Sequence, residues 1–326
     1  MKAVVLTKYG SPYDLQLKEV ENPTPKDNEV LIKVKAASVN DWDWCLVRGV
    51  PFYIRLLCGF FKPKVRIPGV DIAGQVVETG KDVSQFQHGD EVYGDLSENG
   101  FGGFAEYVCA PVSALALKPK KMTYIEAAAI PHAAMLTVQG LRDLGEIQSG
   151  QKLLINGAGG GVGTLGVQIA KAIGVEHVTG VDSAGKLDMM HSVGFDHVID
   201  YKKDDFTKNE QCYDLILDPK TNRSIFSYLR VLRPNGSYVT VGGATAWLFQ
   251  ALFFSPIIRS FIKKNVHVLG LKPNKDLDYI NELFEAGELK PVIDGPYKLS
   301  RTVEAIRHFG EGKHKGKVII TMEDGL

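Results

Sequence analysis

A glycine-rich turn between a strand and a helix constrains the fold of this chain more than any other feature. The apolar run 152–155 leads directly into Asn156-Gly157-Ala158-Gly159-Gly160-Gly161-Val162-Gly163, and a helical pattern follows over Val162–Ile173. Glycines in such a turn allow a tight bend, a close approach of the backbone to a pyrophosphate and close packing of the helix on the strand. The N–H groups at the positive end of the helix then bind phosphate. The pattern therefore predicts a dinucleotide site, whose cofactor-binding residues are Gly157, Gly160, Gly161, Val162 and Gly163.

Strands and helices keep alternating after this turn, which excludes a merely flexible glycine loop as the simpler interpretation. The strand and helix patterns that follow are His177–Val181, Lys186–Ser192, His197–Ile199, Tyr213–Leu217, Ser224–Leu232 and Tyr238–Val241. Alternation at this pitch predicts a parallel sheet with helices on both faces. Further along, we expect a strand at 266–271, helices at 277–286 and 303–309, and a last strand at 317–321.

The first 120 residues have a different character. Short apolar runs separated by Gly, Pro, Asn and Asp predict β-strands in a compact barrel-like or sandwich-like domain. Near Met122 the pattern becomes helical over 124–144, and Pro131 marks a break within it. A chain of 326 residues is expected to form two domains rather than one.

Composition limits the partners. Lys plus Arg and Asp plus Glu are both 38, so the net charge gives no reason to expect nucleic acid or an anionic membrane as the main partner. The longest apolar stretch, 247–262, is interrupted by polar residues, so we expect no membrane span. The start of the chain lacks a secretory pattern and the four cysteines form no CxxC pair, which predicts reduced thiols and a cytoplasmic location.

The residues expected around the adenosine give conflicting signals. Asp182, with Ser183 after it, ends the second predicted strand 19 residues after Gly163, where a carboxylate binds ribose hydroxyls and favours NAD. Lys186 and Tyr201 are residues that hold a 2′-phosphate and favour NADP. An N-cap role for Asp182 and a solvated helix position for Lys186 are the alternatives. The choice between NADP(H) and NAD(H) therefore stays open.

Seven segments together resemble the medium-chain dehydrogenase/reductase superfamily, nearest its zinc-independent quinone oxidoreductase and enone reductase branch, which includes chloroplast-envelope members. They are 37–43, 68–74, 88–94, 102–107, 156–163, 198–201 and 315–320. The resemblance implies an α/β fold with a GroES-like β-rich catalytic domain and a Rossmann domain with a doubly wound parallel sheet. It predicts a catalytic domain at 1–121, a cofactor domain at 122–264, and a return segment at 265–326 that completes the cofactor sheet edge and the catalytic domain. It also implies a homodimer.

The resemblance also assigns individual residues. Asn40 and Asp43 match the motif near the nicotinamide and substrate, although turn geometry is an alternative role. Thr137 matches a position on the nicotinamide side, with a helix back-bond as the alternative. Lys317 matches a residue that approaches the cofactor, with a solvated strand end as the alternative.

Two aromatic stretches, 42–61 and 247–261, match variable loops over the active site in relatives, although core or subunit interface is the more frequent role of such stretches. We consider Tyr53 as a proton donor, and His132 as a packing residue. Gly242 and Gly243 end the last core strand at the carboxyl edge, where ligands bind, and a simple turn is the alternative.

The motifs that carry zinc ligands in the superfamily are altered here, since the first holds Asn40 and Asp43 and the second has Asp71 without His. A catalytic zinc needs about three Cys, His or carboxylate ligands, so we expect none. Without zinc, alcohol oxidation is difficult, whereas hydride addition to a quinone or an α,β-unsaturated carbonyl spreads its charge into a quinol or enolate. The sequence thus predicts an NAD(P)H-dependent oxidoreductase of a small apolar carbonyl or quinone. The alternatives are a dinucleotide-binding redox sensor or structural protein without significant turnover, and a metal-dependent alcohol dehydrogenase.

Overall fold

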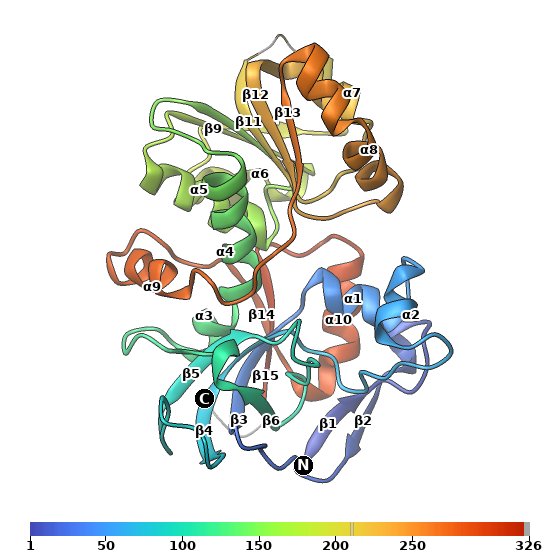
Figure 1. The fold of residues 1–326 in the computed structure, drawn as a ribbon, viewed down its shortest axis with the longest axis vertical. Coiled ribbons are helices and arrows are strands. Elements are labelled where there is room, and N and C mark those ends of the chain that lie inside the picture. Colours follow the sequence, from blue (N-terminus) through green and yellow to red (C-terminus); the bar gives the residue numbers. More distant parts are fainter. Residues whose placement is uncertain (209, 211, 323–326) are drawn as a thin grey trace. The chain divides into compact units, whose positions relative to one another are not determined.

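The computed structural model describes residues 1–208, 210 and 212–322, which fall into two compact units (Figure 1). Unit 1 contains Met1–His132, Pro273–Glu285 and the chain from Ile293 onward, and unit 2 contains Ala133–Lys272 and Ala286–Val292. The sequence-based division placed its boundaries after residues 121 and 264. In the structure the chain passes from unit 1 to unit 2 after His132 and returns after Lys272. It enters unit 2 once more for the short segment 286–292.

Unit 1 is built on a sheet with the strand order β14-β15-β3-β4-β5-β7, and β6 pairs with β3. Its strands are β3 (Glu29–Ser38), β4 (Asp71–Thr79), β5 (Glu91–Asp95), β6 (Tyr107–Pro111), β7 (Ala116–Leu117), β14 (Ile293–Lys298) and β15 (Lys317–Thr321). A separate antiparallel pair is formed by β1 (Lys2–Val5) and β2 (Gln16–Glu19). The helices of this unit are α1 (Asp41–Arg48), α2 (Tyr53–Cys58), α3 (Tyr124–Ala128), α9 (Leu277–Glu285) and α10 (Thr302–Gly310). Because β15 pairs with β3, the C-terminal segment completes the N-terminal sheet.

Unit 2 is a parallel sheet with the order β10-β9-β8-β11-β12-β13. Its strands are β8 (Lys152–Asn156), β9 (His177–Asp182), β10 (His197–Asp200), β11 (Tyr213–Asp218), β12 (Leu232–Thr240) and β13 (Asn265–Val268). Its helices are α4 (Pro131–Val138, which begins in unit 1), α5 (Gly161–Ile173), α6 (Leu187–Ser192), α7 (Ile225–Val231) and α8 (Thr245–Ile262), and a π-helical turn at Gln139–Leu144 extends α4. The chain runs outward from β8 in one direction and from β11 in the other, which places the switch of strand order between them. The predicted fold class is confirmed.

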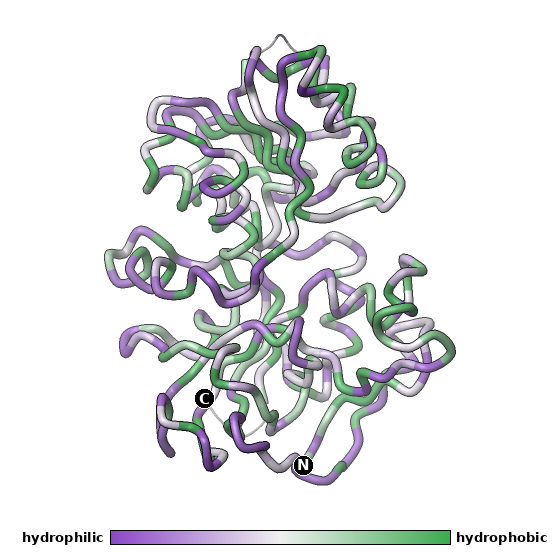
Figure 2. Tube along the Cα trace, in the orientation of Figure 1, coloured by the Kyte–Doolittle hydropathy of each residue, from purple (hydrophilic) through white to green (hydrophobic). Residues whose placement is uncertain are grey.

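Each unit has its own apolar core, and hydrophobic residues concentrate along the sheet strands (Figure 2). In unit 1 the core includes Ile32 and Ile72 on neighbouring strands. In unit 2, Tyr228 and Tyr238 stack with ring centroids 4.8 Å apart, and the Tyr238 hydroxyl donates to Asp218 Oδ2 at 2.8 Å. The hydrogen bond satisfies a carboxylate that is fully buried in the sheet.

Four elements differ from the expectation. The stretches 42–61 and 247–261 contain α1, α2 and α8, where the resemblance predicted loops. α8 has apolar residues on both faces, so it lacks the polar stripe by which an amphipathic helix is recognised. β14 contains Asp294-Gly295-Pro296, which reads as a turn, although it pairs in parallel with β15 through a register shift.

The close approach of β3 and β4 gives a test of this packing. A Cβ added at Gly74 would lie 2.4 Å from the Lys33 carbonyl oxygen, so the two strands would have to move apart. We expect Gly74→Ala to lower the free energy of unfolding by about 1–3 kcal/mol in urea titrations. Gly270→Ala is the matched control, because no atom lies within 4 Å of its added Cβ. Equal stability of the two variants would contradict this packing.

Candidate functional site

The predicted glycine turn follows β8 and leads into α5. Gly163 packs against the backbone of the turn, because an added Cβ would lie 2.3 Å from the Ala158 carbonyl oxygen. Gly157 has a φ of 97°, a backbone conformation that favours glycine. Gly160 is the N-cap of α5 and offers no side chain to the helix, which begins at Gly161. The first N–H groups of α5 therefore have no intrahelical partner and can bind an anion.

The predicted adenosine residues gather where β9 and β10 end. Asp182 Oδ2 accepts a hydrogen bond from Gly159 N at 2.9 Å, and its Oδ1 accepts one from Ser183 N at 2.8 Å. Lys186 Nζ lies 3.4 Å from Asp182 Oδ1, and both side chains are buried. Tyr201 donates its backbone N–H to the Asp182 carbonyl oxygen at 3.2 Å, while its side chain is exposed. The Asp182 carboxylate is thus bonded to the turn itself, which is a contact that sequence reasoning did not anticipate.

The remaining cofactor predictions in unit 2 lie on α4 and after β12. Thr137 Oγ1 donates to the carbonyl oxygens of Ala133, at 2.9 Å, and Val162, at 3.1 Å. The first is the helix back-bond considered above, and the second ties α4 to the start of α5. Gly242 and Gly243 follow the carboxyl end of β12, and Gly243 has a φ of 112°. Their contact with a cofactor stays a prediction.

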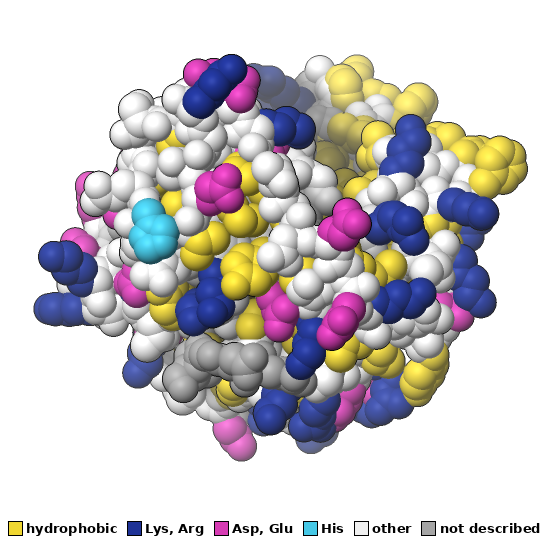
Figure 3. Space-filling view, turned by 90° about the horizontal axis from the view of Figure 1, so that it is seen from below, with side chains coloured by type: hydrophobic (Ala, Val, Ile, Leu, Met, Phe, Trp, Pro, Cys, Tyr) yellow, Lys and Arg dark blue, Asp and Glu magenta, His cyan; other side chains and the backbone are white. Residues whose placement is uncertain are grey.

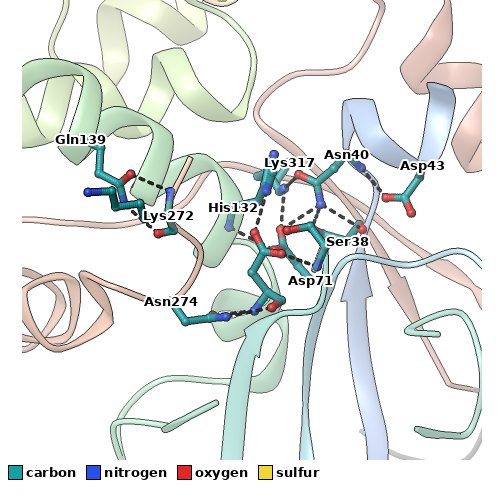
Figure 4. A network of polar contacts seen from close by, with 11 residues as sticks. Ser38, Asn40, Asp43, Asp71, His132, Gln139, Lys272, Asn274 and Lys317 are labelled. Carbon is teal, nitrogen blue, oxygen red and sulfur yellow. Dashed lines mark hydrogen bonds and ion pairs between the residues drawn. The ribbon is translucent and has the colours of Figure 1, made fainter. Parts of the chain in front are cut away.

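In unit 1 a buried polar network surrounds Asp71, the first residue of β4 (Figure 4). Asp71 Oδ2 accepts hydrogen bonds from Ser38 Oγ at 2.8 Å and from Asn40 Nδ2 at 3.0 Å. Lys317 Nζ lies 3.0 Å from the same oxygen and donates to Asn40 Oδ1 at 2.6 Å. The structure thus brings Asn40 and Lys317 together, as neighbours in one network. Asp71 and Ser38 were missed as site residues, although Asp71 stands where zinc-dependent relatives have a His-containing motif.

Asp43 has contacts of its own beside this network. Its Oδ2 accepts a hydrogen bond from Asn40 N at 2.9 Å, and its Oδ1 accepts one from Gly69 N at 2.7 Å. The side chain is completely buried, and burial raises the pKa of Asp43 to about 7. These contacts cap α1 and fix the loop before β4, which is the turn-geometry role. Participation of Asp43 in catalysis stays a prediction.

His132 joins the network on its other side. Its backbone N–H donates to Asp71 Oδ1 at 3.0 Å, and its Nδ1 lies 2.7 Å from Asp95 Oδ2. Burial alone would lower the pKa of His132, but the adjacent Asp95 carboxylate outweighs it and raises that pKa above its ordinary value. The pKa of Asp95 is lowered because the charge of His132 outweighs the effect of burial. Each of the two buried side chains therefore stabilises the charged form of the other.

Tyr53 lies at the start of α2, in an exposed apolar surface rather than among the network residues. Exposed members of this surface are Phe52, Leu56, Leu57, Phe60 and Phe61. Figure 3 shows hydrophobic side chains gathered at the right-hand edge, where α2 lies in Figure 1, with Lys and Arg beside them. Burial raises the pKa of Tyr53, so its hydroxyl stays protonated at neutral pH. A role as proton donor stays a prediction.

Potential metal ligands are dispersed. Within residues 1–208, 210 and 212–322, no group of three or more His, Cys, Asp or Glu side chains is arranged to hold a metal ion. Burial raises the pKa of Cys45 to about 12 and that of Cys109 to about 11. Protonated thiols are poor zinc ligands, since zinc binds the thiolate.

Two family models match the chain. One is described as the alcohol dehydrogenase GroES-like domain and covers residues 26–120, and the other as zinc-binding dehydrogenase and covers residues 193–320. The 2-methylene-furan-3-one reductase of Solanum lycopersicum is 35% identical, over 98% of this chain and 79% of that protein. The chain belongs to the medium-chain dehydrogenase/reductase superfamily. The predicted superfamily and branch are thereby confirmed.

Other members of the superfamily agree. The NADPH-dependent alkenal/one oxidoreductase, chloroplastic, of Arabidopsis thaliana is 32% identical, over 98% of this chain and 79% of that protein. The structure of the quinone oxidoreductase from Coxiella burnetii superposes with a TM-score of 0.87 at 27% identity, over 98% of this chain and 99% of that one. These similarities confirm the predicted oxidoreductase class.

Removing the ammonium group of Lys317 tests the charge balance around Asp71. Lys317→Met leaves a buried carboxylate uncompensated, so we expect a loss of about 3–5 kcal/mol in the free energy of unfolding. The double variant Asp71→Asn/Lys317→Met should regain a large part of that loss, because the unpaired charge is gone. Chemical denaturation of all three proteins measures this, and strictly additive effects would contradict the proposed pairing.

The His132–Asp95 pair predicts a pH dependence of stability. A raised His132 pKa gives stability that is complete below about pH 6.5 and is lost as pH rises through the folded-state pKa. A lowered Asp95 pKa gives stability that is complete above about pH 4 and is lost as pH falls through its folded-state pKa. The difference in unfolding free energy between wild type and His132→Asn should therefore be largest between these limits and shrink on the alkaline side. If the unfolding free energies of wild type and His132→Asn ran parallel above about pH 6.5, this predicted pH dependence would be refuted.

Proposed function

We propose that this chain is a zinc-independent NAD(P)H-dependent reductase of quinones or α,β-unsaturated carbonyl compounds. The observation that carries the proposal is the glycine turn of unit 2, which combines open N–H groups at the start of α5 with the carboxylate of Asp182. The relatives named for quinone, alkenal and furanone reduction support the substrate class.

The residues of the turn fit a dinucleotide on geometric grounds. At Gly159, an added Cβ would lie 2.4 Å from Lys186 Cδ, and at Gly163 it would lie 2.3 Å from a backbone oxygen, so side chains there would displace the turn. Gly160, Gly161 and Val162 stay partly exposed at the helix start. These residues would hold the pyrophosphate, and the nicotinamide would supply the hydride.

Unit 1 would contribute a rigid set of polar groups rather than a mobile acid. Lys317 and Asn40 are each fixed by Asp71, so their donors cost little reorganisation when charge develops on a substrate oxygen. Hydride addition to the conjugated system produces an enolate or quinol anion, which water or a nearby protonated group neutralises. This reaction does not require the metal-bound alkoxide that alcohol oxidation uses.

For the cofactor we propose NADPH. The Asp182 carboxylate is already bonded to Gly159 N and Ser183 N and lies beside Lys186, so its charge is compensated within the turn. A 2′-phosphate at the end of β9 would then meet compensated charge instead of a free carboxylate. The relative from Arabidopsis thaliana is named for NADPH dependence.

Turnover is the direct test. We expect purified protein to oxidise NADPH in the presence of quinones or enones, measured as the loss of nicotinamide absorbance. This activity should be retained after chelator treatment. Cofactor binding without turnover of any such substrate would instead support a dinucleotide-binding protein that acts as a sensor or scaffold. Activity that is lost on chelation and restored by zinc would refute zinc independence.

Lys186 tests the cofactor preference. Lys186→Ala leaves Asp182 uncompensated, so the Kd for NADPH should rise at least about tenfold, while the Kd for NADH changes little. Lys171→Ala is the matched control, because Lys171 forms an exposed ion pair with Asp196 on the same unit. Fluorescence titration measures the Kd values for NADPH and NADH. An equal rise of both Kd values in Lys186→Ala would show that Lys186 only shapes the turn.

A further inference from the structure

α8 has apolar residues on two opposite faces, but only one of these faces packs against the rest of unit 2. Its outward residues recur every three or four positions, as expected for one face of a helix. They are Phe249, Leu252, Phe253, Ile257 and Phe261. Phe253 is 73% exposed and Phe261 is 84% exposed. A helix that is apolar all round is normally enclosed on every side, so the outward face requires a covering surface.

The opposite face anchors α8 to unit 2. Ala251 and Ile258 are buried in the unit 2 core. Gln250 Oε1 accepts a hydrogen bond from Ile225 N at 2.9 Å, and Ser255 Oγ donates to the Val266 carbonyl oxygen at 2.9 Å. By length and composition alone α8 could cross a membrane. Its anchored face shows that it lies on the sheet domain as a fixed part of the fold (Figures 1 and 2).

The chain segment that contains α8 carries charge of one sign. Residues 219–272 of unit 2 contain no Asp or Glu and eight basic residues, which are Lys220, Arg223, Arg230, Arg233, Arg259, Lys263, Lys264 and Lys272. Arg223 and Arg233 pair with acidic residues outside this segment. Arg259 and Lys263 are exposed within and directly after α8. The balanced net charge of the whole chain therefore conceals this cationic segment.

We propose that α8 docks unit 2 on an anionic lipid bilayer. The exposed phenylalanines would enter the boundary between headgroups and acyl chains, and Arg259 and Lys263 would contact anionic headgroups. A second copy of this chain is the less complementary occupant, because pairing two such faces would bring like charges together. This proposal does not depend on the proposed catalytic activity.

Vesicle sedimentation tests the docking, with pure phosphatidylcholine vesicles compared with vesicles that contain about one-third phosphatidylglycerol. We expect the full chain to bind the anionic vesicles, and the binding to weaken as salt is raised. Phe253→Ser/Phe261→Ser should weaken binding at least about tenfold without changing the melting temperature, since both side chains are exposed. Arg259→Glu/Lys263→Glu should weaken it similarly, whereas Lys120→Glu/Lys121→Glu, an equal charge change on exposed residues of unit 1, should leave binding intact.

Several results would overturn the proposal. One is the absence of binding by the wild type, and another is binding lost only in Phe61→Ser, which alters the exposed surface beside α2. A third is a wild-type dimer that Phe253→Ser/Phe261→Ser converts into a monomer without vesicles, which would assign the face to a second copy. A fourth is a Phe253→Ser/Phe261→Ser variant that has a raised KM for a soluble quinone but unchanged vesicle binding. That result would assign α8 to the substrate site.

Discussion

The buried charge of Asp71 is the interaction on which much of unit 1 depends. A carboxylate that is removed from water is tolerated only where donors and an opposite charge replace its hydration. Here those groups come from far apart in the chain, since Ser38 ends β3, Lys317 begins β15 and His132 supplies its backbone N–H. One carboxylate thus holds together the end of β3, the start of β4 and the returning C-terminal strand, and it fixes Asn40 at the same point.

Unit 2 also contains a buried carboxylate, Asp182, that holds separate parts of the chain together. The turn after β8 must bring the backbone close to α5 and leave its first N–H groups open to an anion, so side chains are excluded at several positions. The Asp182 carboxylate bonds to Gly159 N and holds this turn from the neighbouring strand. The ion pair with Lys186 compensates that charge, and in doing so it alters what a nucleotide phosphate would encounter there.

The two aromatic surfaces show how a local pattern can suggest the wrong element. Residues 247–261 lack a polar stripe and contain Pro256, so they resemble a loop or an interrupted span, yet they form α8. The structure shows one apolar face packed on the core and the other facing outward. The inner face is hydrophobic because it packs on the core of unit 2. The outer face, as we propose, is hydrophobic because it contacts lipid.

The sequence by itself determined the dinucleotide turn, the alternation of strands and helices and the superfamily, because these depend on residues that are neighbours in the chain. Through the resemblance, it also predicted that Asn40 and Lys317 lie near the cofactor. Only the tertiary structure decided that Asp71 and Ser38 join Asn40 and Lys317 in one network, that Asp182 bonds to Gly159, and that His132 pairs with Asp95. These contacts join residues separated by 23 to 246 positions. Their formation depends on strand register and burial, and no local pattern of residues specifies either.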